Sequence, residues 1–361
     1  MNFVHIADIH LDSHFVNLSD KENMGELRRM EQRKAFKKII DFIKDNEIEC
    51  FFIAGDLYEN QYIKQSTIEY INNLFKTIPN TKIFITPGNH DPYIKDSYYN
   101  KFLWNENVKI FSSKVEKIET KDADIYGFGF DDFYYEGNIK DKLIVENKNK
   151  INILVMHAAL NGANTKEKVY NPISQKELEN MDFDFIALGH IHKRNYENGT
   201  KNQKIVYPGS TTSLGFDELG EHGMIVGNID KNGLELQFVP VDESQFVEME
   251  IDVTSIISKE ELIEKINETK INNNQFAKII LTGKRNFEIN PYELYKLNLN
   301  EKIIKVKDKT KINYDIEKLA NQNTLKGLFC SEMLEKIKNE TDEPKKRIIE
   351  NAIEVGLEAL E

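Results

Sequence analysis

Several polar clusters in this sequence carry the side chains of a metal site, and each follows an apolar run. The loop at residues 87–91 follows the apolar run at residues 82–86 and offers an amide, an imidazole and a carboxylate. Four further clusters end other apolar runs in the same way. The five clusters are Asp8 and His10, Asp56, Asn89 and His90, His157, and His190 and His192. Such a mixture of ligands suits two borderline divalent ions such as manganese, iron or zinc.

The spacing within the clusters favours one shared cavity. Alternate residues of an extended chain lie on one side, so Asp8 and His10 can face the same space, as can His190 and His192. Ligands of open α/β sheets bind beyond the carboxyl ends of the strands, which is where these clusters are expected. Asp56 is the carboxylate placed to bridge two ions, which lie about 3.5–4 Å apart in two-metal sites.

The remaining histidines have a plainer interpretation. A single histidine after an apolar run is usually an ordinary core or surface residue, and only the number of coinciding clusters argues otherwise. His5 lies inside the first apolar run and is interpreted as structural or as a support for the metal ligands. His14 and His222 are interpreted as ordinary residues.

The elements that must position these clusters alternate along the first two thirds of the chain. Apolar, β-rich runs predict buried strands, and helical spacing of apolar residues predicts the helices between them. Strands are expected at residues 2–7, 50–54, 82–86, 151–156 and 183–188, with closing antiparallel strands at 205–210, 224–229 and 234–241. Helices are expected at residues 22–47, 64–78 and 96–104. Residues 108–130 suggest edge strands or a second sheet.

The pattern changes near residue 240, where the apolar runs no longer end in polar clusters. Strands are expected at residues 246–253, 276–283 and 302–306, and helices at 259–269 and 291–297. Two amphipathic helices, at residues 325–339 and 344–360, end the chain. We therefore predict three segments. They are a domain at residues 1–242 that carries the site, a small α/β capping domain at 243–323, and C-terminal helices at 324–361.

Composition sets limits on the function. The net charge of −12 argues against a protein that coats polyanions, but bound metal ions can reverse the sign locally, so nucleic acid stays open as a substrate. The two cysteines provide neither a disulfide framework nor a CxxC pair. No apolar run approaches the ~18 residues of a membrane span, and the first residues lack the blocks of a signal peptide. We expect a cytoplasmic protein without membrane contact.

A basic cluster lies on the first predicted helix. Its members are Arg28, Arg29, Arg33, Lys34, Lys37 and Lys38. Residues four apart are neighbours on a helix, so Arg29, Arg33 and Lys37 would form one stripe. Such clusters are more often a solvated face that is paired with acidic residues, and contact with a DNA backbone is the alternative.

Together the motifs resemble the calcineurin-like metallophosphoesterases, and in particular their DNA-repair exonuclease branch of SbcD-like and YhaO-like proteins. The motifs are His5-Ile6-Ala7-Asp8-Ile9-His10, Gly55-Asp56, Gly88-Asn89-His90-Asp91, His157, Gly189-His190-Ile191-His192 and Tyr207-Pro208-Gly209-Ser210. They cover about residues 1–230. His14 departs from the YhaO-like pattern, in which proline is expected. The resemblance implies an α/β fold of four layers, a β-sandwich flanked by helices, followed by the cap and the C-terminal helices.

The resemblance also implies a role for each cluster. One metal ion would be bound by Asp8, His10, Asp56 and His192. The other would be bound by Asp56, Asn89, His157 and His190. The catalytic residues would be His90, which stabilises charge on the phosphoryl oxygens and the leaving group, and Asp91, which holds His90 in its working tautomer.

The implied function is a DNA nuclease with two divalent metal ions, most consistent with manganese. It would be a 3′-to-5′ exonuclease, or an endonuclease, that hydrolyses phosphodiester bonds in DNA repair or end processing. The branch implies a homodimer and an SMC-like coiled-coil ATPase partner of the SbcC type. The C-terminal helices would contact this ATPase, or would simply pack on the cap. The alternatives are a phosphoesterase for nucleotides or phosphoproteins, and a DNA-end-binding scaffold with a vestigial site.

Overall fold

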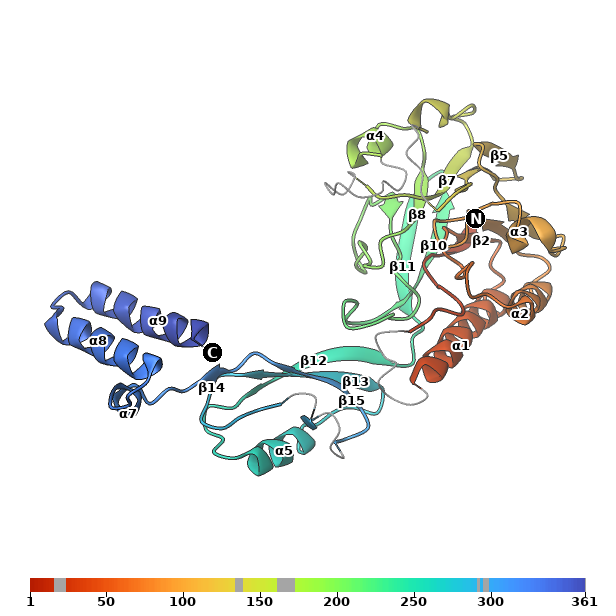
Figure 1. Ribbon diagram of the computed structural model, residues 1–361. Coiled ribbons are helices and arrows are strands. Elements are labelled where there is room, and N and C mark those ends of the chain that lie inside the picture. Colours follow the sequence, from red (N-terminus) through yellow and green to blue (C-terminus); the bar gives the residue numbers. More distant parts are fainter. Residues whose placement is uncertain (16–23, 134–138, 161–172, 291–292, 295–298, 361) are drawn as a thin grey trace. The chain divides into compact units, whose positions relative to one another are not determined.

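The computed structural model describes residues 1–15, 24–133, 139–160, 173–290, 293–294 and 299–360. The chain forms two compact units, which Figure 1 shows in sequence colours. The first unit comprises Met1–Val247 and Ile271–Ala277, and the second comprises Glu248–Lys270 and Lys278–Glu361. The three segments predicted from the sequence, with boundaries at residues 242 and 323, stay a prediction.

The larger sheet of the first unit has six strands and carries three of the polar clusters. In spatial order the strands are β11 (Gly233–Pro240), β10 (Gly223–Asp230), β1 (Asn2–Ile6), β2 (Cys50–Ile53), β3 (Lys82–Ile85) and β4 (Val108–Ile110). Strands β1 to β4 are parallel, and the hairpin of β10 and β11 joins them in antiparallel fashion. Parallel pairing brings the carboxyl ends of β1, β2 and β3 to one edge.

The second sheet of this unit carries the other two clusters. Its order is β5 (Glu116–Glu119), β6 (Ala123–Phe128), β7 (Ile151–His157), β8 (Phe185–Gly189) and β9 (Ile205–Val206). Strands β6 to β9 are parallel, and β5 is antiparallel to β6. The antiparallel pairing predicted for residues 205–210 is therefore wrong, because β9 runs parallel to β8. Residues 108–130 therefore contribute an edge strand to the first sheet and two strands to the second.

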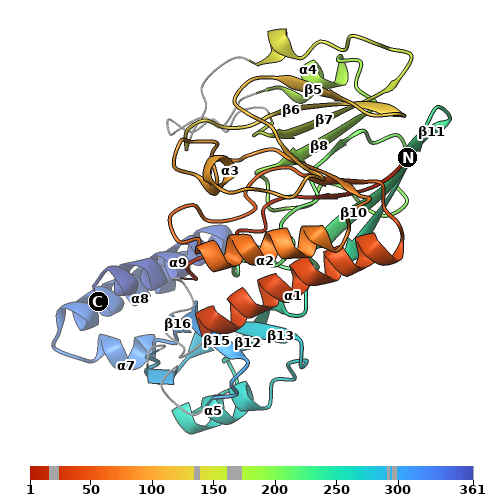
Figure 2. The same cartoon turned by 90° about the vertical axis from the view of Figure 1, so that its right-hand side faces the viewer.

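Alternation along the strands builds four layers. Phe52 and Phe3 point between the two sheets, where they pack with Phe185 of β8. Phe51 points the other way, into a core that contains apolar residues of α1 (Met24–Asp45) and α2 (Gln65–Lys76). Leu188 of β8 faces the outer side of the second sheet, where α4 (Gln175–Glu179) packs. Figures 1 and 2 show α1 and α2 side by side. The fold is therefore mixed α/β, with stacked sheets flanked by helices.

One predicted helix is much shorter than expected. Only α3 (Tyr98–Lys101) is helical within residues 96–104. The backbone is extended again at Phe102, and the indole of Trp104 donates to the carbonyl of Tyr98, which closes the turn. Tyr99 is buried and its hydroxyl donates to Asp91, so this aromatic residue serves the core.

The second unit contains helices and the greater part of a small sheet, two of whose strands begin among residues of the first unit. The sheet is formed by β12 (Gln245–Asp252), β13 (Gln275–Thr282) and β15 (Ile303–Asp308), and β14 (Lys284–Arg285) pairs with β16 (Lys311–Ile312). The helices are α5 (Lys259–Asn267), α7 (Ile316–Ala320), α8 (Leu325–Asn339) and α9 (Glu343–Ala359). Most of the helix predicted at residues 291–297 lies outside the described residues. Among the described helices, none has the length and apolar character needed to cross a bilayer.

His5 gives the fold a specific sensitivity to acid. This residue of β1 is fully buried beside Phe185, and burial lowers the pKa of His5 to about 3. The unfolded chain binds the proton near pH 6.5, so His5 costs stability as the pH falls from 6.5 towards 3. We expect His5→Leu to unfold at higher denaturant than the wild type at pH 5, with a smaller difference at pH 8. Chemical denaturation at both values measures this, and an equal difference at both would refute it.

Candidate metal centre

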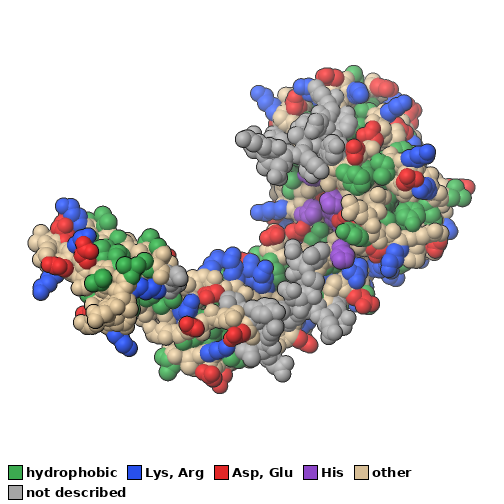
Figure 3. All heavy atoms as spheres, in the orientation of Figure 1, with side chains coloured by type: hydrophobic (Ala, Val, Ile, Leu, Met, Phe, Trp, Pro, Cys, Tyr) green, Lys and Arg blue, Asp and Glu red, His purple; other side chains and the backbone are tan. Residues whose placement is uncertain are grey.

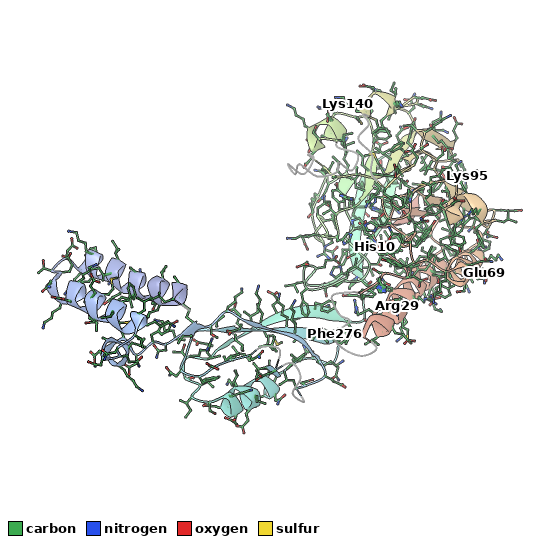
Figure 4. All side chains as sticks on the ribbon, viewed as in Figure 1. His10, Arg29, Glu69, Lys95, Lys140 and Phe276 are labelled. Carbon is green, nitrogen blue, oxygen red and sulfur yellow. The ribbon has the colours of Figure 1, made fainter. Side chains whose placement is uncertain are left out.

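The five predicted clusters meet at one edge of the first unit. Asp8 and His10 follow β1, Asp56 follows β2, Asn89 follows β3, and the remaining ligands end or follow β7 and β8. Backbone bonds join the first two loops, because the amide of Asp8 donates to Gly55 and the amide of His10 donates to Asp56. Figure 3 shows histidine side chains gathered on this face of the unit, and Figure 4 labels His10.

One half of the cluster centres on Asn89. Its Oδ1 lies 2.9 Å from Nε2 of His157 and 3.2 Å from Nδ1 of His190. Asp56 Oδ2 lies 3.4 Å from the same Nε2 of His157. Four candidate metal ligands, which end or follow four different strands, therefore converge here.

The other half contains His10 and His192, whose Nε2 atoms face each other at 3.2 Å. Ligand atoms of Asp8, His10 and His192 all lie within 4.8 Å of one another, and so do those of Asp8, Asp56 and His157. Asp56 Oδ2 is also 3.7 Å from Nε2 of His10. Asp56 thus stands between the two halves, where a bridging ligand would stand.

The hydrogen bonds made by the Nδ1 atoms of His10 and His192 show that their facing Nε2 atoms are suited to bind a cation. The Nδ1 atoms of His10 and His192 lie 2.7 Å from Glu59 Oε1 and 2.6 Å from Glu218 Oε1. Because a carboxylate only accepts, each Nδ1 carries the proton, and the two facing Nε2 atoms hold lone pairs unless a second proton is bound. A divalent ion bound between the two Nε2 atoms would accept both lone pairs and remove their repulsion. Carboxylates that orient metal-binding histidines are a common arrangement.

The backbone of the cluster is strained, which supports a functional role. Seven non-glycine residues in the described part of the chain have positive φ, and four of them are Asp8 at 53°, His10 at 52°, Asp56 at 52° and His190 at 99°. Each such residue costs of order 1–3 kcal/mol, and this strain clusters at functional sites. The loops are also closely packed, because a Cβ on Gly88 would collide with the Asp56 carboxylate.

The electrostatics of the cluster also favour a cation. Burial opposes charge on the imidazole of His157, but Asp56 outweighs it and raises the pKa of His157 to about 9. Burial likewise opposes charge on His192, but its bond to Glu218 and the charge of Asp8 raise the pKa of His192 to about 9. A positive charge, from a proton or from a metal ion, is therefore stabilised between these groups.

His90 has a different partner from the one predicted. Its Nδ1 lies 2.9 Å from Glu59 Oε2, so one carboxylate holds both His10 and His90. The carboxylate of Asp91 instead accepts from the amides of Asp56 and Gly88 and from other donors around it. The prediction that Asp91 orients His90 is therefore wrong: Asp91 is fully buried and shapes the loops that carry the ligands.

Sequence reasoning missed the two carboxylates that orient the rings. Glu59 lies three residues after Asp56, and its place in that loop was an available signal. Glu218 lies 26 residues after His192, and no periodicity marks it. Its Oε2 accepts from Ser210 at 2.8 Å and from the amide of Leu214 at 3.0 Å, so the loop fixes it firmly.

The basic stripe on α1 is largely paired. Arg33 donates to Asp12 at 3.0 Å, and Lys37 forms an ion pair with Asp41 at 2.6 Å. Arg29, which Figure 4 labels on α1, is half-buried. The solvated, paired face thus accounts for most of the stripe, and contact with DNA stays a prediction for Arg29.

Glu218 provides a test of the histidine orientation. We expect Glu218→Gln to weaken manganese binding at one of two sites by about 10- to 100-fold, the usual cost of losing a partner of a metal-binding histidine. Isothermal titration with manganese measures both sites. Glu221→Gln, an exposed neighbour, is the matched control and should bind like the wild type. Unchanged binding in Glu218→Gln would show that this carboxylate does not support a metal ligand.

Comparison with known proteins agrees with this geometry. Residues 1–194 match the family of calcineurin-like phosphoesterases. The uncharacterized metallophosphoesterase YhaO of Bacillus subtilis is 26% identical over 278 residues, which are 74% of this chain and 67% of that protein. DNA double-strand break repair protein Mre11 of Methanocaldococcus jannaschii is 27% identical over 301 residues, which are 77% of this chain and 76% of that protein.

The family match spans more than half of the chain and contains all the candidate ligands that end or follow β1, β2, β3, β7 and β8. Members of this family are metal-dependent phosphoesterases, and the clustered donors fit that chemistry. The chain belongs to the calcineurin-like phosphoesterase family.

Proposed function

We propose that this protein is a manganese-dependent DNA nuclease that hydrolyses phosphodiester bonds at DNA ends, as a 3′-to-5′ exonuclease. The observation that carries the phosphoesterase chemistry is the position of Asp56 Oδ2 near Nε2 of both His10 and His157, with Nε2 of His192 facing that of His10. DNA as the substrate is supported by the similarity to a double-strand break repair protein, which extends over 301 residues and thus beyond the family match.

The residues divide into two ligand sets that share Asp56. One set is Asp8, His10, Asp56 and His192. The other is Asp56, Asn89, His157 and His190. When bound, the two ions would activate water and neutralise charge on the phosphate. The rings are held for this task by Glu59, Glu218 and the carbonyl of Ala54.

We assign His90 to the substrate rather than to an ion, although ligand atoms of His90, His10 and Asp56 also lie within 4.8 Å of one another. Its side chain is 45% exposed, and Glu59 holds the Nδ1 atom. The Nε2 atom has no hydrogen-bond partner among the described residues, so it is free to donate to a phosphoryl oxygen or to the leaving group. Burial opposes charge on His90, but Glu59 and Asp56 raise its pKa to about 9, which keeps the ring a donor.

A substrate screen tests the proposal. Linear duplex and single-stranded DNA, bis-p-nitrophenyl phosphate, cyclic nucleotides and a phosphopeptide are incubated with the purified chain, with manganese and with a chelator. We expect manganese-dependent shortening of DNA from its 3′ ends. Hydrolysis of nucleotides or phosphopeptides without any cleavage of DNA would favour the alternative phosphoesterase. DNA binding without hydrolysis of any substrate would favour the scaffold.

We also propose that α8 and α9 contact a coiled-coil ATPase of the SbcC type. The two helices pack on each other through Cys330, Ile353 and Leu357. Large apolar side chains nevertheless stay exposed on them, including Leu328 at 68% and Val355 at 63%. Aspartate at both positions should abolish co-purification with such an ATPase. The homodimer and the cytoplasmic location stay predictions.

A further inference from the structure

A second cavity lies beside the loops that carry the candidate metal centre. Its volume is about 490 Å³, and its lining includes His14, Tyr62, Arg29, Arg33 and Lys64. No function proposed above uses this cavity. It combines aromatic rings with cationic side chains, which is the combination that binds single-stranded nucleic acid.

Short backbone bonds tie the cavity to the catalytic loops. The amide of Ser13, next to His14, donates to the carbonyl of His10 at 3.0 Å. The amide of Tyr62 donates to the carbonyl of Glu59 at 2.9 Å. Because Glu59 also holds the rings of His10 and His90, both aromatic residues are fixed within one turn of the residues proposed to act on the phosphate.

The two aromatic rings of the cavity keep exposed surface. Tyr62 is 50% exposed and His14 is exposed, although both lie in short, bonded loops. Their ring centroids are 5.2 Å apart, with an angle of 37° between the planes. The two rings therefore form a tilted pair that still presents aromatic surface. His14 is also the residue that departs from the proline expected in the YhaO-like pattern.

The charges around the rings favour a phosphate. The Asp12 carboxylate is engaged by Arg33 at 3.0 Å and by the hydroxyl of Thr67 at 2.6 Å. Lys64 is exposed at the rim, and Arg29 lines the wall. Glu26 is the one further acidic side chain in the described lining. In a chain of net charge −12, this excess of cations is a local feature.

We infer that this cavity is a subsite for an unpaired nucleotide of the DNA strand that is cut. Tyr62 and His14 stack on the base, and Arg29 and Lys64 bind the adjoining phosphates. Because stacking surfaces accept every base, the subsite recognises single-stranded character and not sequence. The inference rests on the proposed function in that DNA is the substrate. It adds that a frayed or overhanging end is bound in preference to a blunt one.

Binding of a short single-stranded oligonucleotide tests the subsite. The oligonucleotide carries 2-aminopurine at its 3′ end, and a chelator prevents cleavage. We expect Tyr62→Ala to weaken binding by about 5- to 100-fold, the range for the loss of one stacked base. It should also abolish the quenching of 2-aminopurine by stacking. Tyr62→Phe should keep both, because the ring remains.

The controls separate this inference from the proposed function. Ile144→Ala alters an exposed apolar residue that precedes β7, and it should bind like the wild type. Equal binding and quenching by Tyr62→Ala and the wild type would overturn the subsite, as would an equal loss in Tyr62→Phe. Quenching by a wild-type chain that cleaves no DNA with manganese would instead uphold the subsite and refute the nuclease.

Discussion

Asp56→Asn is expected to lose both metal ions together. Asp56 Oδ2 lies 3.4 Å from Nε2 of His157 and 3.7 Å from Nε2 of His10, so one oxygen serves both halves of the cluster. An amide of the same size has no charge with which to hold two cations. We expect the apparent affinity of each site for manganese to fall by about 100-fold or more. The loss should be at least as large as the loss caused by removing a residue that only orients a ligand.

Isothermal titration with manganese measures both sites in this variant, and DNA hydrolysis should fall with them. Asp41→Asn is the matched control, because Asp41 is an exposed aspartate that pairs with Lys37 on α1. This control should keep two sites and full activity. Two tight sites in Asp56→Asn would contradict a bridging role.

His90→Ala should separate chemistry from metal binding. His90 is held by Glu59 and is not one of the proposed ligands, so the variant should keep two ions per chain. Turnover should fall by about 10²- to 10⁴-fold, the usual contribution of a general acid or base. Metal content by mass spectrometry and steady-state kinetics on DNA test both statements. A variant without metal would place His90 among the ligands.

Glu59→Gln tests whether one carboxylate supports both a metal site and the catalytic histidine. Because Glu59 holds the rings of both His10 and His90, its loss should lower turnover and also weaken one metal site. If Glu59→Gln lowered turnover alone, its contact with His10 would have no role in metal binding.

The sequence was sufficient to predict that the ligands meet. Parallel strands present their carboxyl ends at one edge, so polar residues after β1, β2, β3, β7 and β8 converge whatever their distance along the chain. The same residues could be recognised because five such clusters coincide, although a single histidine after an apolar run is usually an ordinary residue. The apolar runs predicted the individual strands and helices, whereas the stacked sheets flanked by helices were implied by the resemblance to the family.

The partners of those ligands could not be predicted in the same way. Asp91 is adjacent to His90 in sequence, yet its carboxylate turns to backbone amides because the loop folds around it. Glu218 reaches His192 only because the loop after β9 is fixed by its own hydrogen bonds. The direction in which a loop side chain points depends on tertiary contacts, and no periodic pattern in the sequence reveals those contacts.

The basic cluster on α1 shows the same limit of prediction from sequence. In the sequence Arg28 is part of a basic cluster expected on a solvated face, but it is buried, forms an ion pair with Glu31 and donates to the carbonyl of Ser213. Its guanidinium also lies 5.2 Å from the ring centre of Phe246. Ser213 and Phe246 lie far away along the chain, so helical spacing alone could not separate Arg28 from Arg29.

The central claim is that two metal ions lie between these side chains, and anomalous X-ray diffraction from crystals grown with manganese tests it directly. The account predicts two peaks about 3.5–4 Å apart. Asp56 should contact both, with His10 and His192 at one and His157 and Asn89 at the other. The absence of any peak among these residues, or a single peak that does not contact Asp56, would contradict it.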